Sequence, residues 1–312
     1  MESLLLSFNA IAPIFLLMLL GYVLKALNVA DEKTFDTINK LVFKIFLQIL
    51  LFYNIYKTET LEIFDVKLIT FIIIFELCLF IVGYIAVILI TKDNPKRGVM
   101  LQGFYRSNFA FLGVPLVGYI YGDNSTGLAS MMVAIVVPLF NILAVFSLER
   151  FRGGKLSLKK LIIGVLKNPL IIGCAIGIIC MIFKIKFPKF IETSISDIAK
   201  IATPLAIIVL GASFTFSSMH GYGKEITIVT LTRLVIVPLI GIAIAVFAGI
   251  RGEALACLLV TLGSPVAISS ITMSQQMDGD GTLAAHNVVV TSTFCIFTLF
   301  IWIFILSFMN LL

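Results

Sequence analysis

Two short stretches with closely similar sequences interrupt long apolar segments of the chain: residues 113–116 (Gly-Val-Pro-Leu) and residues 263–266 (Gly-Ser-Pro-Val). A proline inside a helix removes a backbone hydrogen bond and clashes with the preceding turn, and the glycine two residues earlier lets the chain open. In lipid, the freed backbone groups must be satisfied by protein or by a water-filled cavity. One break in each half of the chain predicts two discontinuous membrane helices around a solute site near the bilayer midplane.

The chemistry that such breaks could perform is anion binding. We expect helix N-termini at Pro115 and Pro265, with free N–H groups and about half a positive charge each. A terminus of this kind binds a carboxylate or another anion. Small polar residues nearby could hydrogen-bond the solute, although such residues also pack membrane helices together. The predicted substrate-binding residues are Ser107, Asn108, Gly113, Val114, Pro115, Asn141, Gly263, Ser264, Pro265 and Val266, with Ser269 as a further hydrogen-bonding candidate.

Ionisable residues inside apolar segments are the second group of functional candidates, because a charge within the bilayer is costly. Glu76 and Arg233 lie at nearly equivalent positions of the two halves. Our hypotheses are a proton-linked or gating role for Glu76, and for Arg233 either pairing with a carboxylate or support of the anion site. A structural ion pair or a snorkelling side chain is the alternative for both. His286 is a candidate proton relay or a packing residue, and Arg106 has either an interfacial or a pathway role.

The composition requires lipid as the solvent of this chain. Of its 312 residues, 60% are hydrophobic and 13% are charged, whereas soluble domains carry about 25% charged residues. The net charge of +6 is concentrated in loops, which favours a lipid bilayer and not nucleic acid as the partner. No cysteine and histidine spacing suggests a metal site, and we expect no cofactor. The sequence predicts a multi-pass protein of the cell membrane.

The elements that must position these residues are ten spans of about 20 apolar residues. Residues 1–7 contain no basic side chain, so we expect a retained first helix and not a signal peptide. The most basic loop, 149–160, is expected in the cytoplasm, which places both termini outside. Residues 184–200 are expected to be polar, as a loop or as a short interfacial helix. The predicted spans are 4–24, 37–56, 68–91, 98–121, 127–148, 161–183, 201–216, 226–250, 253–277 and 282–308.

The two halves of the chain repeat. Pro13 and Gly21 match Pro169 and Gly177 at a shift of 156 residues (169 − 13 and 177 − 21). Each half holds five predicted spans, and an odd number forces the second half to enter the membrane from the opposite side, so the repeats must be inverted. We expect a first five-helix repeat at 1–150, a cytoplasmic linker at 151–160 and a second five-helix repeat at 161–312.

Five motifs in order resemble the auxin efflux carrier family, which includes plant PIN-type auxin exporters and bacterial malonate and malate permeases. Arg106-Ser107-Asn108-Phe109, leading to the break at 113–116, resembles its fourth helix. The remaining motifs resemble its sixth, seventh, ninth and tenth helices, and lie at 168–171 (Asn-Pro-Leu-Ile), 204–207 (Pro-Leu-Ala-Ile), 264–267 (Ser-Pro-Val-Ala) and 283–293.

The resemblance implies an all-α membrane protein of ten transmembrane helices in two inverted five-helix repeats, with the broken helices 4 and 9 crossing at the substrate site. It also implies a scaffold domain of helices 1, 2, 6 and 7, a transport domain of helices 3–5 and 8–10, and elevator-like movement of organic anions. Asn108 and the two prolines map onto the binding region. One departure is Gln48, where the second helix of the family usually carries a proline. A homodimer is a further expectation.

The predicted function is secondary transport of a small organic anion, a carboxylate, across the cytoplasmic membrane, with proton linkage as one hypothesis. The alternative is a sodium-coupled organic-anion symporter of the bile-acid-carrier type, because broken helices also coordinate sodium through exposed carbonyl groups. A passive channel is the remaining option. An enzyme is not expected, since the sequence has no HExxH motif, no GxSxG motif and no aspartate pair on facing spans.

Overall fold

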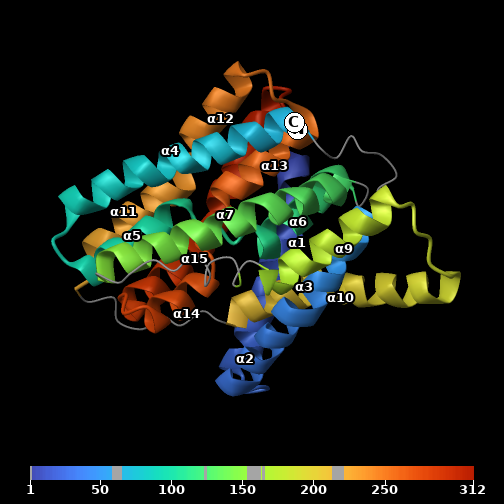
Figure 1. The fold of residues 1–312 in the computed structure, drawn as a ribbon, viewed down its shortest axis with the longest axis horizontal. Helices are drawn as coiled ribbons and strands as arrows, with labels where there is room; N and C mark the ends of the chain where they lie inside the picture. Colours follow the sequence, from blue (N-terminus) through green and yellow to red (C-terminus); the bar gives the residue numbers. More distant parts are fainter. Residues whose placement is uncertain (1, 58–64, 123–124, 153–162, 164–165, 213–220) are drawn as a thin grey trace.

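The computed structural model describes residues 2–57, 65–122, 125–152, 163, 166–212 and 221–312, and this part of the chain is helical without a strand (Figure 1). Seven helices are long and apolar enough to cross a membrane, and three shorter apolar helices lie between them. The long helices are α1 (Glu2–Ala26), Glu32–Tyr56, α4 (Val66–Ile90), α7 (Thr126–Arg152), α10 (Lys189–Ala212), Gly223–Phe247 and α15 (Gly281–Phe308); the shorter ones are Phe109–Tyr121, α9 (Pro169–Ile182) and Gly252–Gly263.

Two of the long helices contain a widened π-helical turn. The helix Glu32–Tyr56 consists of α2 (Glu32–Leu41), η1 (Val42–Phe46) and α3 (Leu47–Tyr56). The helix Gly223–Phe247 consists of α11 (Gly223–Leu231), η5 (Thr232–Ile236) and α12 (Val237–Phe247). Such turns occur mainly at functional sites or where a helix must absorb strain. Pro238 is the second residue after η5, whereas Gln48 is the second residue after η1.

The outer faces of the long helices are apolar, as a protein in lipid requires. Phe247 is 92% exposed and Leu89 is 81% exposed, and both belong to long apolar helices. A soluble protein rarely leaves so much contiguous apolar surface in water. The structure therefore supports several membrane-spanning helices, while the number of ten and the inverted repeat stay predictions.

Two of the predicted connections between spans differ from the described structure. Residues 184–200 do not form a polar loop, because α10 begins at Lys189 and continues without interruption to Ala212. Its first turns are polar and its remainder is apolar, which is the pattern of a helix that emerges from a membrane. The predicted linker 151–160 begins inside α7, which ends at Arg152, and 153–160 lie outside the described residues.

Two helices are interrupted, but the first interruption is not at the predicted residues. It separates α5 (Asn94–Tyr105) from η3 (Phe109–Gly113) and lies at 106–108, whereas residues 113–116 are helical. The π-helical turn of η3, in which the Val114 N–H bonds to the Phe109 carbonyl, leads into α6 (Val114–Tyr121). Pro115 is the second residue of α6, where the absence of an N–H group removes no hydrogen bond within that helix. The widened turn before it relieves the clash of its ring with the preceding turn.

The second interruption lies where the sequence predicted it. Helix α13 (Gly252–Gly263) ends before Ser264, and α14 (Ser269–Gln276) begins after residue 268. Pro265 lies inside the non-helical segment. The helix halves that follow the two interruptions therefore begin at Phe109 and Ser269, not at Pro115 and Pro265.

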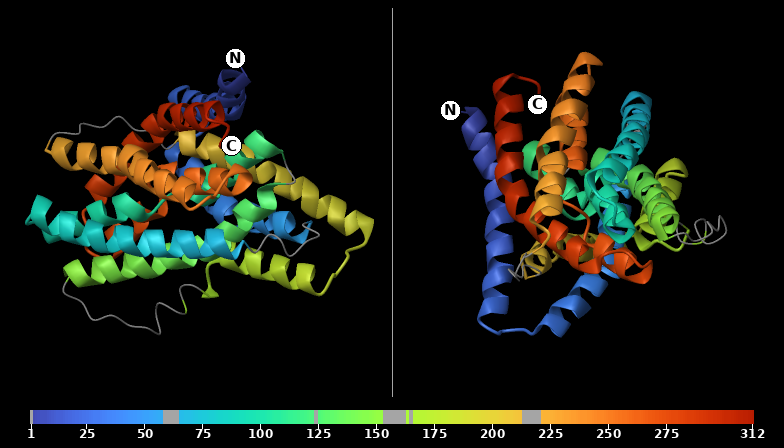
Figure 2. Two further views of the ribbon diagram at one scale, coloured as in Figure 1. Left: turned by 90° about the horizontal axis from the view of Figure 1, so that it is seen from above. Right: turned by 90° about the vertical axis from the view of Figure 1, so that its left-hand side faces the viewer.

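The helices form two groups that lie against each other. Helix α10 packs against α1 and α3, and α3 also packs against α9. In the other group, α4, α5 and α7 run side by side, α12 packs on α13, and α15 contacts α11 and α14 (Figure 1). Contacts between α1 and α15 join the two groups. The two chain ends lie near each other at one end of the molecule (Figure 2).

Glycines permit the close approach of helices in the first group. A Cβ atom added to Gly211 of α10 would lie 1.9 Å from the Met18 carbonyl oxygen of α1, and one added to Gly21 would lie 1.9 Å from the Ile208 carbonyl oxygen. At Gly177 of α9 the added atom would lie 2.9 Å from the Phe52 carbonyl oxygen of α3. Small residues allow membrane helices to pack with their backbones in contact.

The change Gly211→Ala is expected to destabilise the protein by about 1–3 kcal/mol, the usual cost of overpacking a tight interface. The melting temperature of detergent-purified protein measures the effect. Gly223→Ala is the matched control, because nothing lies within 4 Å of the added methyl group there. Equal melting temperatures for the two variants would contradict a backbone-to-backbone contact between α1 and α10.

Candidate functional site

The two interruptions cross each other and exchange backbone hydrogen bonds. The Asn108 N–H donates to the Pro265 carbonyl oxygen at 2.7 Å, and the Ala267 N–H donates to the Arg106 carbonyl oxygen at 3.1 Å. Ser107 and Val266 thereby form an isolated antiparallel bridge. The Val266 N–H donates to the hydroxyl oxygen of Thr291, in α15, at 3.0 Å. Each interruption thus satisfies backbone groups that the other would leave unpaired in lipid.

Arg233 joins the ends of the two helices that lead into the crossing. Its side chain is fully buried, and its guanidinium group donates to carbonyl oxygens at the C-terminus of α13, Thr261 at 2.6 Å and Ser264 at 2.8 Å. It also donates to the C-terminus of α5, to Phe104 at 3.2 Å and Tyr105 at 3.1 Å. A helix C-terminus carries partial negative charge and free carbonyl groups. Arg233 therefore caps two helices with one side chain.

Glu76 of α4 is fully buried, and both of its carboxylate oxygens are without a hydrogen-bond partner among the described residues. Its charge interacts electrostatically with that of Arg233, but the guanidinium hydrogen bonds described above go to main-chain carbonyls. A buried polar group without a partner is rare in folded proteins. A structural ion pair was one of the alternatives for Glu76, and none of the described ion pairs includes it.

Arg106 lies in the first interruption, and the described partners of its guanidinium group are all side chains. The residue is 4% exposed. Its guanidinium group donates to the Asn141 amide oxygen of α7 at 2.8 Å, the Ser269 hydroxyl of α14 at 3.0 Å and the Gln102 amide oxygen of α5 at 3.1 Å. It also lies 2.6 Å from the Met273 sulfur. All of these partners are neutral.

Further polar atoms at and near the crossing are buried without a partner among the described residues. They come from the first interruption, from the start of α14 and from α15. A cluster of this kind is where a polar solute or ordered water would complete the hydrogen bonding. The atoms are Ser107 Oγ, Asn108 Nδ2, Ser270 Oγ, Asn287 Oδ1 and Nδ2, and Ser292 Oγ.

Pro115 and Val114 line a cavity of about 490 Å³ instead of the crossing. Seven residues of helix, about 10 Å at the rise of an α-helix, separate Pro115 from Asn108. Two lysines line the same cavity, Lys57 after α3 and Lys200 in α10. The structure therefore divides the predicted substrate site into a buried crossing and a separate cavity between the two helix groups. The other lining residues are Leu50, Tyr53, Asn54, Gly118, Tyr119, Thr126, Ser196, Ala199, Thr203 and Pro204.

The remaining predicted residues occupy different places. Gly113 closes η3, where a Cβ atom would lie 2.2 Å from the ring of Phe109. Gly263 ends α13, and the Ser264 hydroxyl donates to the Val260 carbonyl oxygen. His286 of α15 packs against the ring of Tyr222 at 5.9 Å. None of the described hydrogen bonds or ion pairs connects His286 to the crossing.

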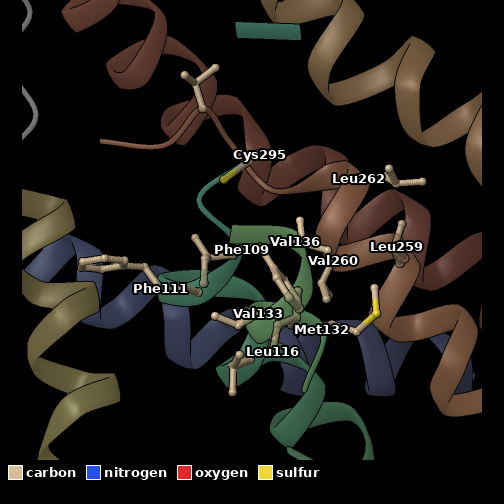
Figure 3. Close-up of a cluster of buried hydrophobic side chains, with 14 of the residues drawn as sticks. Phe109, Phe111, Leu116, Met132, Val133, Val136, Leu259, Val260, Leu262 and Cys295 are labelled. Carbon is tan, nitrogen blue, oxygen red and sulfur yellow. The ribbon is translucent and has the colours of Figure 1, made fainter. Parts of the chain in front are cut away.

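A cluster of buried apolar side chains lies next to the first interruption. Phe109, Met132, Val133 and Val260 belong to one buried cluster contributed by η3, α7 and α13. Figure 3 shows these side chains gathered between the helices. An apolar surround strengthens electrostatic interactions at the crossing because it lowers the local dielectric constant. Among the described residues, no group of His, Cys, Asp and Glu side chains is arranged to hold a metal ion.

Long apolar helices and paired interruptions with a buried polar centre are typical of membrane transporters. A sequence model of the family described as "Membrane transport protein" matches residues 6–303. The chain therefore belongs to this family, the auxin efflux carrier family, as its motifs predicted. The family is one of transporters.

Curated relatives match over nearly their whole length. The chain is 24% identical over 310 residues to the uncharacterized transporter MJ1031 of Methanocaldococcus jannaschii, covering 96% of this chain and 98% of the relative. It is 23% identical over 300 residues to the uncharacterized transporter YfdV of Escherichia coli, covering 94% and 95%. These names give no substrate.

The sequence left Arg106 with either an interfacial or a pathway role, and it did not predict that Thr291 takes part in the crossing or that Lys57 and Lys200 line the cavity. A signal existed for Arg106, which directly precedes the two polar residues assigned to the site. Thr291 donates its hydroxyl proton to the Asn287 carbonyl one turn earlier, so its own oxygen accepts from Val266. No local pattern distinguishes that threonine from the others on α15. The lysines come together only through packing of α3 and α10.

Proposed function

We propose that this transporter carries a small organic anion, a carboxylate, across the cytoplasmic membrane. The observation that supports this proposal is the charge at the crossing. Apart from His286, the buried acidic and basic side chains among the described residues are Glu76, Arg106 and Arg233, so guanidinium groups outnumber the carboxylate. An unpaired buried charge is costly. A bound anion would remove the excess, whereas a bound cation would increase it.

The movement that we propose is elevator-like alternating access. The helices proposed as the scaffold, α1, α2–α3, α9 and α10, contain the glycine contacts, and the crossing lies among the helices proposed as the transport domain. The cavity with Lys57 and Lys200 lies between the two groups. A group of helices that slides along this boundary would expose the crossing to one side of the membrane at a time.

The cavity also suggests which side is open. It lies near the end of α3, the end of α6 and the beginning of α7. These ends belong to the loops opposite the basic 149–160 loop, which is expected in the cytoplasm. We therefore propose that the cavity faces outward and that both termini are extracytoplasmic. The two lysines would attract anions to this opening.

The coupling ion is a separate part of the proposal. Glu76 supports proton linkage, because it is a buried carboxyl group with no hydrogen-bond partner among the described residues. The family matches give no support to the sodium-coupled bile-acid-carrier alternative.

Uptake into proteoliposomes of labelled acetate, malonate, malate and indole-3-acetate, with a pH gradient or a sodium gradient, tests the proposal. Saturable flux with counterflow distinguishes a carrier from a channel.

Asn108→Ala is expected to lower the transport rate at least about tenfold, the effect of losing one to two kcal/mol of hydrogen bonding to a polar solute. The protein should still fold, because the Asn108 amide nitrogen has no partner among the described residues and the backbone bonds of residue 108 remain. The initial rate of substrate uptake into proteoliposomes is the measurement.

Asn9→Ala serves as the control for this variant, since Asn9 is exposed on α1. Both variants are compared with the wild type for monodispersity in detergent. Wild-type flux through folded Asn108→Ala would remove Asn108 from the substrate site.

A further inference from the structure

We propose that Arg106, and not Arg233, holds the carboxylate group of the transported anion. This inference rests on the proposed function above and names the group that recognises the substrate. The two arginines are both buried near the crossing, but their partners differ in kind. That difference decides which guanidinium group is available to a ligand.

Arg233 is committed to the fold. Its donors bond to main-chain carbonyls at the ends of α5 and α13, and four such contacts lie between 2.6 and 3.2 Å. A substrate could take these donors only by leaving the carbonyls unsatisfied in a buried place, at about 1–3 kcal/mol for each. Arg233 therefore supports the crossing and does not release its donors.

Arg106 has partners that it can exchange. Gln102, Asn141 and Ser269 accept from it through side-chain oxygens. Each of these side chains can rotate away and leave no main-chain group unpaired. None of them is charged, so the guanidinium charge has no compensating carboxylate among its described contacts. An incoming carboxylate would supply both the charge and two parallel acceptors.

The surroundings of Arg106 offer further donors for the same anion. Ser269 begins α14, so the positive end of that helix dipole points toward this place, while the Ser270 and Ile271 N–H groups already donate to the carbonyl oxygens of Ala267 and Ile268. Ser270 is 2% exposed, and its hydroxyl has no partner among the described residues. Ser269 itself is exposed, which gives the site an open side. A group that only accepts hydrogen bonds fits such a set of donors.

The second interruption, residues 264–268, contains no charged side chain. The residues that bond to the backbone of Arg106 and Asn108 there are Ala267 and Pro265. The site is therefore asymmetric, with one exchangeable cation at the crossing. Such a site fits one planar anionic group. The uncharged remainder of the substrate would lie toward the neutral side chains of Gln102 and Asn141.

Comparison of carboxylates with their amides tests this assignment. The probes are acetate with acetamide, malonate with malonamide, and indole-3-acetate with indole-3-acetamide, added to purified protein during thermal unfolding. At least one carboxylate is expected to stabilise the wild type while its amide does not. Arg106→Gln is expected to weaken that carboxylate at least about tenfold, the effect of losing a charged hydrogen-bonded pair, and to leave carboxylate and amide equivalent.

Three further measurements make the outcome decisive. Arg150→Gln is the matched control, because Arg150 is exposed on α7, and it should retain the wild-type preference. Arg106→Lys keeps the charge without the planar fork and should bind the carboxylate with an intermediate affinity; it replaces the glutamine variant if that variant does not fold. A carboxylate preference in these Arg106 variants equal to that of the wild type overturns this assignment alone. Failure of every carboxylate to stabilise the wild type overturns the proposed function with it.

Discussion

Replacing Arg233 with methionine is expected to prevent accumulation of folded protein. Methionine fills similar space but donates no hydrogen bond, so carbonyls at the ends of α5 and α13 would lose their partner at once. Each buried unsatisfied group costs about 1–3 kcal/mol, and the whole stability of a protein is about 5–15 kcal/mol. The yield of monodisperse protein and its melting temperature are the measurements.

Arg251 provides the matched control for Arg233. It also donates to carbonyls at a helix end, those of Val246 and Ile250, but it is exposed. Water can replace it, so Arg251→Met should change the melting temperature little. If Arg233→Met is as stable as the wild type, the double cap does not hold the crossing together, and the argument that reserves Arg106 for the substrate loses its basis.

The helical spans and the pair of interruptions were predictable because they are local properties of the sequence. Apolar length determines a span, and Pro265 cannot continue the hydrogen bonding of α13. The buried charges Glu76 and Arg233 were recognisable for the same reason, since a charge inside an apolar segment needs an explanation. The extension of α10 to Lys189 was missed because its first turns are polar, although a helix needs no apolar character outside lipid.

The place of the first interruption was not predictable from its proline. Pro115 follows a π-helical turn, and in that turn the chain widens without leaving the helix. The actual interruption at 106–108 contains no proline or glycine, and it is held open by Pro265 and Ala267 from the other half of the chain. A break that is stabilised by hydrogen bonds between distant segments leaves no local signature.

The roles of the two arginines also depend on contacts between distant residues. In sequence, Arg233 lies five residues before Pro238, and Arg106 precedes two small polar residues. Only the crossing brings the ends of α5 and α13 within reach of one guanidinium group. The family resemblance indicated a region for the site as a hypothesis, but it could not show which arginine has its hydrogen bonds satisfied by the fold.

Glu76→Gln is expected to abolish acceleration of uptake by an inward proton gradient while substrate exchange continues. Glutamine has the same shape and cannot take up a proton. The substitution removes no hydrogen bond, because both carboxylate oxygens are unpartnered among the described residues. One proton moved down a gradient of one pH unit is worth about 1.4 kcal/mol, or about tenfold in accumulation. In proteoliposomes, the variant should lose this tenfold gain in substrate accumulation, while its counterflow rate stays near that of the wild type.

The matched control is Glu32→Gln, which neutralises an exposed carboxylate in the first turn of α2. It should keep the response to the proton gradient. Arg233 gives the expected result its physical basis: the charge of Glu76 interacts with the guanidinium group that caps both helix ends, so protonation of Glu76 changes the electrostatic balance at the crossing. Uptake by the wild type that ignores the pH gradient would contradict proton linkage. A proton response that persists in Glu76→Gln would assign the coupling to another residue, and Glu76 would then act only on the stability of the crossing.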